Sequence, residues 1–253
     1  MKKLLAAAAF VALGSAAAFA ADLPARTYTK AAPIIMAPIY SWTGFYVGGH
    51  VGYGWGSEDW TRIDGSGGEE GNGQVRSFKP DGFLAGGQVG FNYQVNQWVF
   101  GIEGAMSWSD VKGGFVGTNN NGPASWNTDI NWLGTLAGRV GYAFNTSLLY
   151  VKGGGAWADE GYNHPATGGQ GQAFNYTGGA TRSGWLVGAG LEYGFTPNWS
   201  ALIEYNYIDF GTNRTTLNER SGRFVTFDMN QTLQTVKVGV NYRFGGGPVV
   251  AKY

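Results

Sequence analysis

Eight titratable side chains stand at alternate positions in segments whose other positions are largely apolar. They are three acids, four bases and one histidine: Glu103, Glu192, Glu204, Arg139, Lys152, Lys237, Arg243 and His50. If these segments are strands, the polar side chains at alternate positions of each strand would all point into one shared interior. Buried charges are costly unless they are paired, so the pattern predicts a lumen charge network of salt bridges across that interior. Such a network would either close the interior or line a path for small ions.

The chain offers little material for catalysis. It contains two histidines, His50 and His164, and neither has a serine at short spacing in a shared exposed site. Because nucleophilic catalysis needs a nucleophile within reach of a base, we predict no catalytic residues and no enzymatic activity. A lipid-modifying enzyme is the alternative, and acyl-chain release from lipopolysaccharide would reveal it.

Two clusters in the predicted connections could suggest a ligand site. Acidic side chains gather in the first long connection, namely Glu58, Asp59, Asp64, Glu69 and Glu70. They lack the spacing of a calcium loop, so we expect a solvated loop there. Tyr162, His164 and Tyr176 are the residues that a haem or a bridging divalent cation would use, but their glycine-rich setting indicates a mobile segment. We therefore predict no metal site and no cofactor-binding site.

The last predicted strand, residues 235–244, shows the period that organises the chain. Val236, Val238 and Val240 alternate with Lys237 and Gly239, which is typical of a strand with one apolar face. Seven earlier segments repeat the alternation, at about 44–55, 83–93, 98–108, 132–144, 149–157, 185–195 and 199–207. The predicted fold is all-β, an eight-stranded antiparallel up-and-down transmembrane β-barrel.

Composition agrees with a barrel in a membrane. The chain has 44 Gly, 10 Trp, 14 Tyr and 15 Phe, which suits curved strands that meet lipid headgroups. After residue 20, no apolar stretch approaches the ~20 residues that a membrane helix needs. A formal net charge of 0 excludes the basic footprint of nucleic-acid binding, and the lack of cysteine excludes a disulfide framework.

The chain divides into four predicted parts. Residues 1–20 have the basic start, apolar core and small-x-small end of a secretory signal peptide, with cleavage between Ala20 and Ala21. Residues 21–41, interrupted by prolines, are predicted to be a periplasmic N-terminal linker. Residues 42–244 would form the outer-membrane β-barrel, and residues 245–253 a C-terminal tail.

Connection lengths predict the orientation of the barrel. Long connections at about 56–80, 110–128, 158–180 and 211–227 alternate with short turns, and an even strand count puts both ends of the chain on one side. In Gram-negative outer membranes the termini and short turns of such barrels are periplasmic. Outward aromatics would then form two girdles at the membrane interfaces. The predicted periplasmic girdle is Phe45, Tyr93, Trp98, Phe144, Phe195, Trp199, Tyr242 and Phe244, and the predicted outer girdle includes Trp55, Phe83, Trp108, Trp132, Trp157, Trp185 and Tyr207.

Three motifs carry a resemblance to a known family. They are Ala21-Asp22-Leu23-Pro24 after the predicted cleavage site, Trp42-Thr43-Gly44-Phe45-Tyr46-Val47-Gly48-Gly49 at the start of the barrel, and Val240-Asn241-Tyr242-Arg243-Phe244 at its end. The chain resembles the alphaproteobacterial outer-membrane immunogenic proteins, small barrels of a porin family. The resemblance implies an OmpA-like eight-stranded barrel in the cell envelope that is exposed as a surface antigen. Members of that family usually end at the terminal aromatic, whereas this chain continues through residues 245–253.

Two functions fit this fold. One is a structural barrel that maintains envelope integrity and mediates surface interactions with host or other ligands through its long loops. Its further partners would be outer-membrane lipid, lipopolysaccharide and the barrel-assembly machinery. The other function is a narrow passive porin for small solutes or ions. Eight strands leave an interior just wide enough for side chains to fill, so we favour the structural barrel with the lumen charges as a plug.

Overall fold

The computed structural model describes residues 40–66, 73–119, 122–167 and 171–244. The predicted signal peptide with its cleavage site at Ala20 and Ala21, most of the predicted linker and the tail 245–253 lie outside these ranges, as do Glu69 and Glu70. None of the described residues belongs to a helix that is long and apolar enough to cross a membrane.

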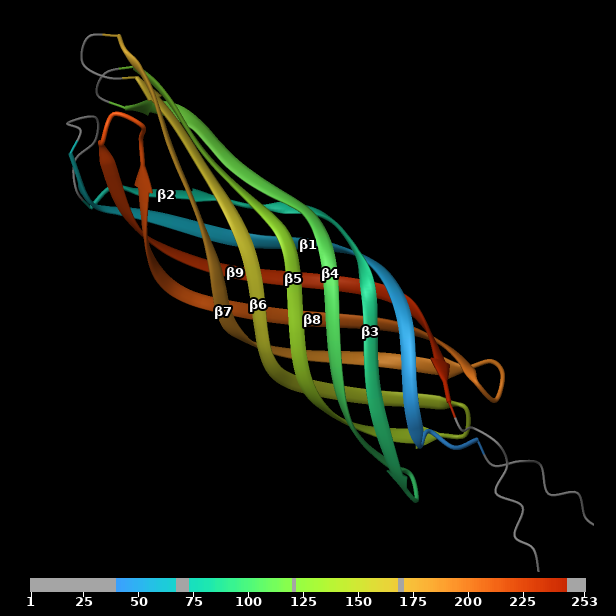
Figure 1. Ribbon diagram of the computed structural model, residues 1–253. Coiled ribbons are helices and arrows are strands. Elements are labelled where there is room, and N and C mark those ends of the chain that lie inside the picture. The colour runs from blue at the N-terminus through green and yellow to red at the C-terminus, as the bar shows by residue number, and fades with distance from the viewer. Residues whose placement is uncertain (1–39, 67–72, 120–121, 168–170, 245–253) are drawn as a thin grey trace, which may run out of the picture. The chain divides into compact units, whose positions relative to one another are not determined.

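Eight long antiparallel strands close into a ring, and one short strand lies beside it (Figure 1). The strands are β1 Gly44–Gly65, β2 Val75–Phe78, β3 Asp81–Val95, β4 Trp98–Asn119, β5 Gly122–Phe144, β6 Ser147–Thr167, β7 Ala173–Gly194, β8 Trp199–Asn218 and β9 Phe224–Arg243. Long strands that are consecutive in the chain pair with each other, and β1 pairs with β9 to close the ring. This topology confirms the predicted all-β, eight-stranded up-and-down barrel.

The barrel exposes apolar side chains around one band of its outer face. Val51, Ile102, Leu136, Val151 and Ile203 are 49–60% exposed although they lie in the middle of the strands. In a soluble protein such a band would be costly, but hydrocarbon surroundings favour it. The aromatics predicted for the two girdles are exposed or half-buried on the same outward face.

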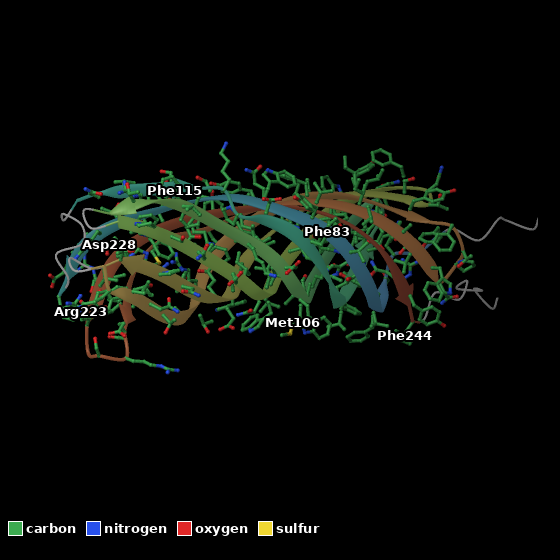
Figure 2. All side chains as sticks on the ribbon, turned by 90° about the horizontal axis from the view of Figure 1, so that it is seen from above. Phe83, Met106, Phe115, Arg223, Asp228 and Phe244 are labelled. Carbon is green, nitrogen blue, oxygen red and sulfur yellow. The ribbon has the colours of Figure 1, made fainter. Side chains whose placement is uncertain are left out.

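The two ends of the barrel differ in their connections. The end near Tyr40 and Phe244, called the terminal end here, has three short connections, at 96–97, 145–146 and 195–198. Asn96 and Asn145 both adopt a φ of 56° there, a conformation that asparagine tolerates in tight hairpin turns. Figure 2 shows Phe244 at the terminal end and Phe115, Arg223 and Asp228 at the opposite, distal end.

The strands extend much further at the distal end than the sequence predicted. The predicted connections 56–80, 110–128, 158–180 and 211–227 are largely strand, because the ring strands that border them, except β3, continue well beyond the aromatic girdle. The prediction was wrong because the polarity of the two faces inverts there. Asp59 and Thr61 face outward, whereas Trp60 between them is fully buried. A strand whose outward side chains are polar lacks the outward apolar face expected in lipid, so these segments were interpreted as solvated loops.

Beyond the apolar band the barrel wall divides into two sheets (Figure 1). One contains β8, β9, β1 and β2, and the other contains β4, β5, β6 and β7. Pairing of β3 with β4 ends at Asp81 and Lys112, and β7 has no residue paired with β8 between Thr177 and Trp185. We call this region, residues 56–65, 75–78, 111–119, 122–131, 158–167, 173–184, 211–218 and 224–233, the distal sandwich.

Aromatic side chains from both sheets fill the distal sandwich. Its buried core comprises Trp60, Phe78, Ala124, Trp126, Tyr162, Ala166, Tyr176, Leu217, Val225, Phe227 and Met229. The Trp60 ring lies 5.2 Å from Phe227 in its own sheet and 5.6 Å from Tyr162 in the facing sheet, measured between centroids. Large buried aromatics dominate core energetics, so the distal sandwich is a packed extension of the barrel.

Candidate functional site

The candidate site is the interior of the barrel, which is filled in layers. From the terminal end these are an aromatic layer around Trp42, an ion network, an apolar layer around Leu133, a second ionic cluster and the aromatic core of the distal sandwich. Side chains form layers because inward positions recur at every second residue of each strand. The first ionic layer contains most of the charges predicted for the lumen.

Five of the predicted lumen charges meet in one cluster, called here the central network: Glu103, Arg139, Lys152, Glu192 and Glu204. Arg139 lies 3.5 Å from Glu103 and 3.1 Å from Glu192. Lys152 lies 3.0 Å from Glu103 and 2.8 Å from Glu204. The side chains are at most 4% exposed and come from five consecutive strands, β4 to β8. These pairs therefore reach across the lumen as well as along its wall.

Neutral side chains complete the hydrogen bonds of the central network. Tyr46 donates to Glu103 at 2.8 Å, Tyr150 donates to Glu204 at 2.9 Å, and Ser200 donates to Glu192 at 2.6 Å. The Arg139 guanidinium also lies 4.8 Å and 4.9 Å from the ring centroids of Tyr46 and Tyr150. A fully bonded buried network is rigid, whereas a partly bonded one is unstable. Sequence reasoning missed these tyrosines as partners, although both have inward parity.

His50 lies in the lumen but contacts neutral partners. Its Nδ1 is 2.6 Å from Gln88 Oε1, and its Nε2 is 2.8 Å from Ser107 Oγ. Lys237 is buried and lines, with His50 and Glu204, a cavity of about 10 Å³, roughly the space of one water molecule. The ion pairs found within the described residues do not include Lys237, contrary to the prediction that it would pair with a glutamate.

Arg243 stands apart from the central network, which corrects the prediction that it would join it. Its guanidinium lies 4.6 Å from the Tyr40 ring and 5.0 Å from the Trp42 ring, and it donates to the Pro197 carbonyl at 3.1 Å. Trp42 is fully buried, and its amide donates to Gln94 at 2.7 Å. The start of the chain's described part thus packs against Arg243 and closes the terminal end of the lumen.

A second ionic cluster lies where the wall divides, in a region predicted to be a solvated loop. Glu58 and Glu160 are buried, and Arg182 lies 2.9 Å from Glu160 and 3.9 Å from Glu58. Trp60 Nε1 donates to Glu58 at 2.7 Å, and the Tyr162 hydroxyl donates to Glu160. Burial raises the pKa of Glu58 to about 8, and the charge of Glu160 adds to this rise. The expected solvated acidic loop was therefore wrong for Glu58.

The three residues named for a haem or cation, Tyr162, His164 and Tyr176, lie in the core of the distal sandwich. His164 stacks between Trp126 and Tyr176, with centroids 4.9 Å and 5.7 Å away, and its Nδ1 lies 2.7 Å from the Ser125 carbonyl oxygen. The expected mobile segment is an ordered aromatic stack. Within the described ranges, no three His, Cys, Asp or Glu side chains gather as metal ligands.

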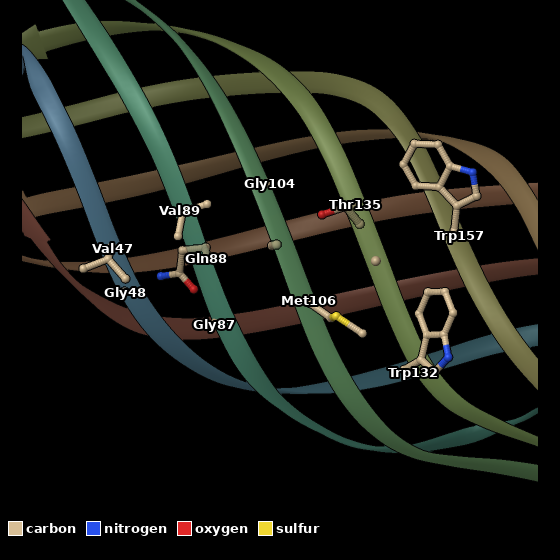
Figure 3. Close-up of a pocket in the computed structure, with 12 residues that line it drawn as sticks. Val47, Gly48, Gly87, Gln88, Val89, Gly104, Met106, Trp132, Thr135 and Trp157 are labelled. Atoms are coloured by element: carbon tan, nitrogen blue, oxygen red, sulfur yellow. The ribbon is translucent and has the colours of Figure 1, made fainter.

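A larger hollow of about 540 Å³ lies on the outward face of the barrel (Figure 3). Its floor includes Gly87, Gly104 and Gly134, and Trp132 and Trp157 stand at one side. These tryptophans belong to the predicted outer girdle, so the hollow opens onto the apolar band rather than into the lumen.

Comparison with known proteins decides the family. The family model of the outer membrane protein beta-barrel domain matches residues 6–244. The chain belongs to this family. The 25 kDa outer-membrane immunogenic protein of Brucella abortus is 31% identical over 230 residues, covering 91% of this chain and 92% of the relative. The 31 kDa outer-membrane immunogenic protein of Brucella melitensis is 30% identical over 242 residues, covering 94% and 98%.

Membership of the family confirms the resemblance seen in the sequence motifs and locates the protein in the outer membrane. A 22 kDa outer membrane protein of Rhizobium leguminosarum bv. viciae is also 31% identical, over 82% of this chain and 80% of the relative. The solved structure of the outer membrane protease OmpT from Escherichia coli has a TM-score of 0.50 at 8% identity, covering 83% of this chain and 99% of that one. At that identity the likeness shows the fold alone.

Proposed function

We propose that this protein is a closed structural barrel that helps to maintain the outer membrane and presents the distal sandwich at the cell surface. The observation that carries the proposal is the central network. Its five charges pair across a lumen that is packed with apolar and aromatic layers on both sides. Side chains fill the interior of an eight-stranded barrel, so we expect no continuous path of water along this lumen.

The distal sandwich supports a role in surface interactions. Its two packed sheets provide a rigid scaffold, and the connections 66–74, 120–121, 168–172 and 219–223 join its strand ends. Binding residues commonly lie on loops that a rigid scaffold positions. We therefore propose that host molecules or other surface ligands are recognised by this end, rather than by long flexible loops.

The proposed orientation places both termini in the periplasm and the distal sandwich outside the cell. The three short hairpin connections at the terminal end match the periplasmic turns of outer-membrane barrels. In this orientation the apolar band contacts lipid, the distal girdle meets lipopolysaccharide, and the barrel-assembly machinery receives the chain from the periplasmic side. We infer no enzymatic role, since His50 and His164 both have partners within packed layers.

Cysteine labelling on intact cells tests the orientation. Val116 is 78% exposed in the distal sandwich, and the chain has no native cysteine, so Val116→Cys carries a single thiol. A membrane-impermeant maleimide should label Val116→Cys on whole cells. The matched variant Asn96→Cys, in a terminal-end turn, should react only after lysis. Labelling of Asn96→Cys alone on whole cells would contradict the proposed orientation.

Uptake of a small hydrophilic dye tests the proposed closed barrel in cells. Removing the protein should not lower the uptake rate, because a closed barrel carries no solute, whereas shortening the tips of the distal sandwich should alter surface binding. A fall in uptake on removal, restored by the wild-type chain, would favour the narrow passive porin instead.

A further inference from the structure

The hollow on the outward face of the barrel is a groove that crosses five adjacent strands of the ring. Its lining passes from Val47 on β1 through Val89 on β3 and Met106 on β4 to Trp132 on β5 and Trp157 on β6, as Figure 3 shows. Neighbouring strands lie about 4.8 Å apart, so the four intervals between these strands make the groove about 19 Å long. A groove of this shape fits an elongated occupant.

The groove leads from one membrane interface into the apolar band. Trp132 and Trp157 belong to the predicted outer girdle, and tryptophan side chains favour the headgroup level of a membrane. At the other end, Val47 is 42% exposed and lies two residues from Phe45 of the predicted periplasmic girdle. The groove therefore runs obliquely across much of the hydrocarbon layer, which is about 30 Å thick.

Two glycines in the floor of the groove, Gly104 and Gly134, are not required by the packing of the chain itself. Neither has a positive φ. A Cβ atom at Gly104 would lie 4.0 Å from the nearest described atom beyond its chain neighbours, and one at Gly134 would make an ordinary contact of 3.4 Å with the Trp132 ring. By contrast, a Cβ atom at the inward Gly48 would collide with Asn241. Glycine weakens a strand unless another group approaches it closely, so Gly104 and Gly134 indicate a neighbour outside the chain.

The surroundings of the groove indicate that this neighbour is hydrocarbon. The chain belongs to an outer-membrane family, and the groove lies in its apolar band with walls formed by Val89, Met106 and Trp157. Between groups that are all surrounded by lipid, association depends on close packing rather than on the hydrophobic effect. Wall atoms without a partner on one side lose their dispersion contacts, so a chain that follows the groove is favoured over one that crosses it.

We propose that this groove binds one acyl chain of lipopolysaccharide, which lies over Gly104 and Gly134 with Trp132 and Trp157 beside its headgroup. The volume of about 540 Å³ lies within the range of small-molecule sites, roughly 300–1,000 Å³. Lipopolysaccharide is the source of the chain because the proposed orientation places the two tryptophans in the outer leaflet. The inference therefore rests on the proposed orientation and adds a specific lipid site to it.

Native mass spectrometry of refolded full-length protein provides the test. The protein is refolded in detergent micelles free of lipid, hexa-acylated lipid A is added, and the lipid molecules that remain bound are counted. The wild type should retain one lipid A molecule. Gly104→Leu places a side chain in the groove and should weaken retention roughly tenfold, equivalent to the loss of about ten carbon–carbon contacts. Gly134→Leu should act in the same way and provides a second variant if Gly104→Leu does not refold.

The matched control is Gly138→Leu. Gly138 faces outward, a Cβ atom there would meet nothing within 4 Å, and the residue does not line the groove. Gly138→Leu should therefore retain lipid A as the wild type does.

Four results would overturn the proposal. The wild type could retain no lipid A, or the folded groove variants could retain as much as the wild type. Equal retention of a phosphatidylethanolamine would assign the groove to phospholipid instead. A wild-type dimer that Gly104→Leu or Gly134→Leu dissociates would assign it to a second copy of the chain. Cysteine labelling reports the orientation and dye uptake reports the closed barrel, so failure here is distinct from failure of the proposed function.

Discussion

Arg139 illustrates how single residues set the properties of the lumen. Its guanidinium lies between two tyrosine rings and contacts Glu103 and Glu192, so it has bonded partners on several sides. Its inward position follows from the period-two alternation of the sequence. Its partners do not follow, because they depend on which strands face each other across the closed ring. For the same reason, Lys237 and Arg243 could be placed inside but not assigned their neighbours.

Replacing Arg139 should strongly destabilise the barrel. Arg139→Ala leaves two buried carboxylates short of a partner, which should cost about 3–5 kcal/mol of unfolding free energy. Urea titration in lipid vesicles, followed by the gel mobility of the folded barrel, measures the loss. Arg214→Ala is the control because its ion pair with Asp228 is largely exposed and should contribute little. An equal loss in both variants would contradict the role of the central network.

Glu58 should make stability depend on pH. Its pKa is raised from an ordinary value of 4.5 to about 8, so the folded form holds the proton more tightly than the unfolded chain does. The resulting stabilisation is complete below the ordinary pKa and is lost as the pH rises through the folded pKa. The unfolding midpoint should therefore fall between about pH 5 and pH 9, and fall less in Glu58→Gln. The same slope in both proteins would refute this assignment.

At the scale of elements, the strands within the apolar band were predictable and their distal continuations were not. The eight alternating segments gave an outward apolar face, which is the signal of a strand in lipid. Beyond the girdle the same strands place Trp126 and Phe227 inside and polar residues outside. The alternation of aromatic and polar residues is present in the sequence of these distal segments. A search for strands with an outward apolar face nevertheless assigns the segments to loops. Tryptophans at the alternate positions that face inward, rather than outward as in the apolar band, were the feature of the sequence that could have revealed these strands.

Trp126→Ala should loosen the distal sandwich while the barrel in the membrane stays folded. The fully buried ring stacks on His164, and truncating a core aromatic costs about 3–5 kcal/mol. Limited proteolysis of vesicle-inserted protein, read by mass spectrometry, should show new cleavage within residues 113–131. Val151→Ala in the apolar band is the control and should show none. Unchanged cleavage in Trp126→Ala, or loss of the whole barrel, would conflict with a separately packed sandwich.

At the scale of the whole barrel, its interior alternates between apolar and ionic layers along its length. Each ionic layer lies between layers of apolar or aromatic side chains, which exclude water and strengthen the ion pairs. Fold, strand number and the presence of a lumen network were predictable because period two determines which residues face inward. The layering was not, because it depends on the stagger between strands. It is this layering that gives the closed barrel its physical basis.

Single-channel recording in planar bilayers tests the closed barrel most directly. Purified wild-type protein, inserted and verified as folded, should give no steady conductance steps. Arg139→Ala, which opens the central network, should give a small or fluctuating leak if it remains inserted. Steady steps in the wild type that Arg139→Ala or Glu103→Ala abolishes would contradict the account and identify the lumen charges as the lining of a pore.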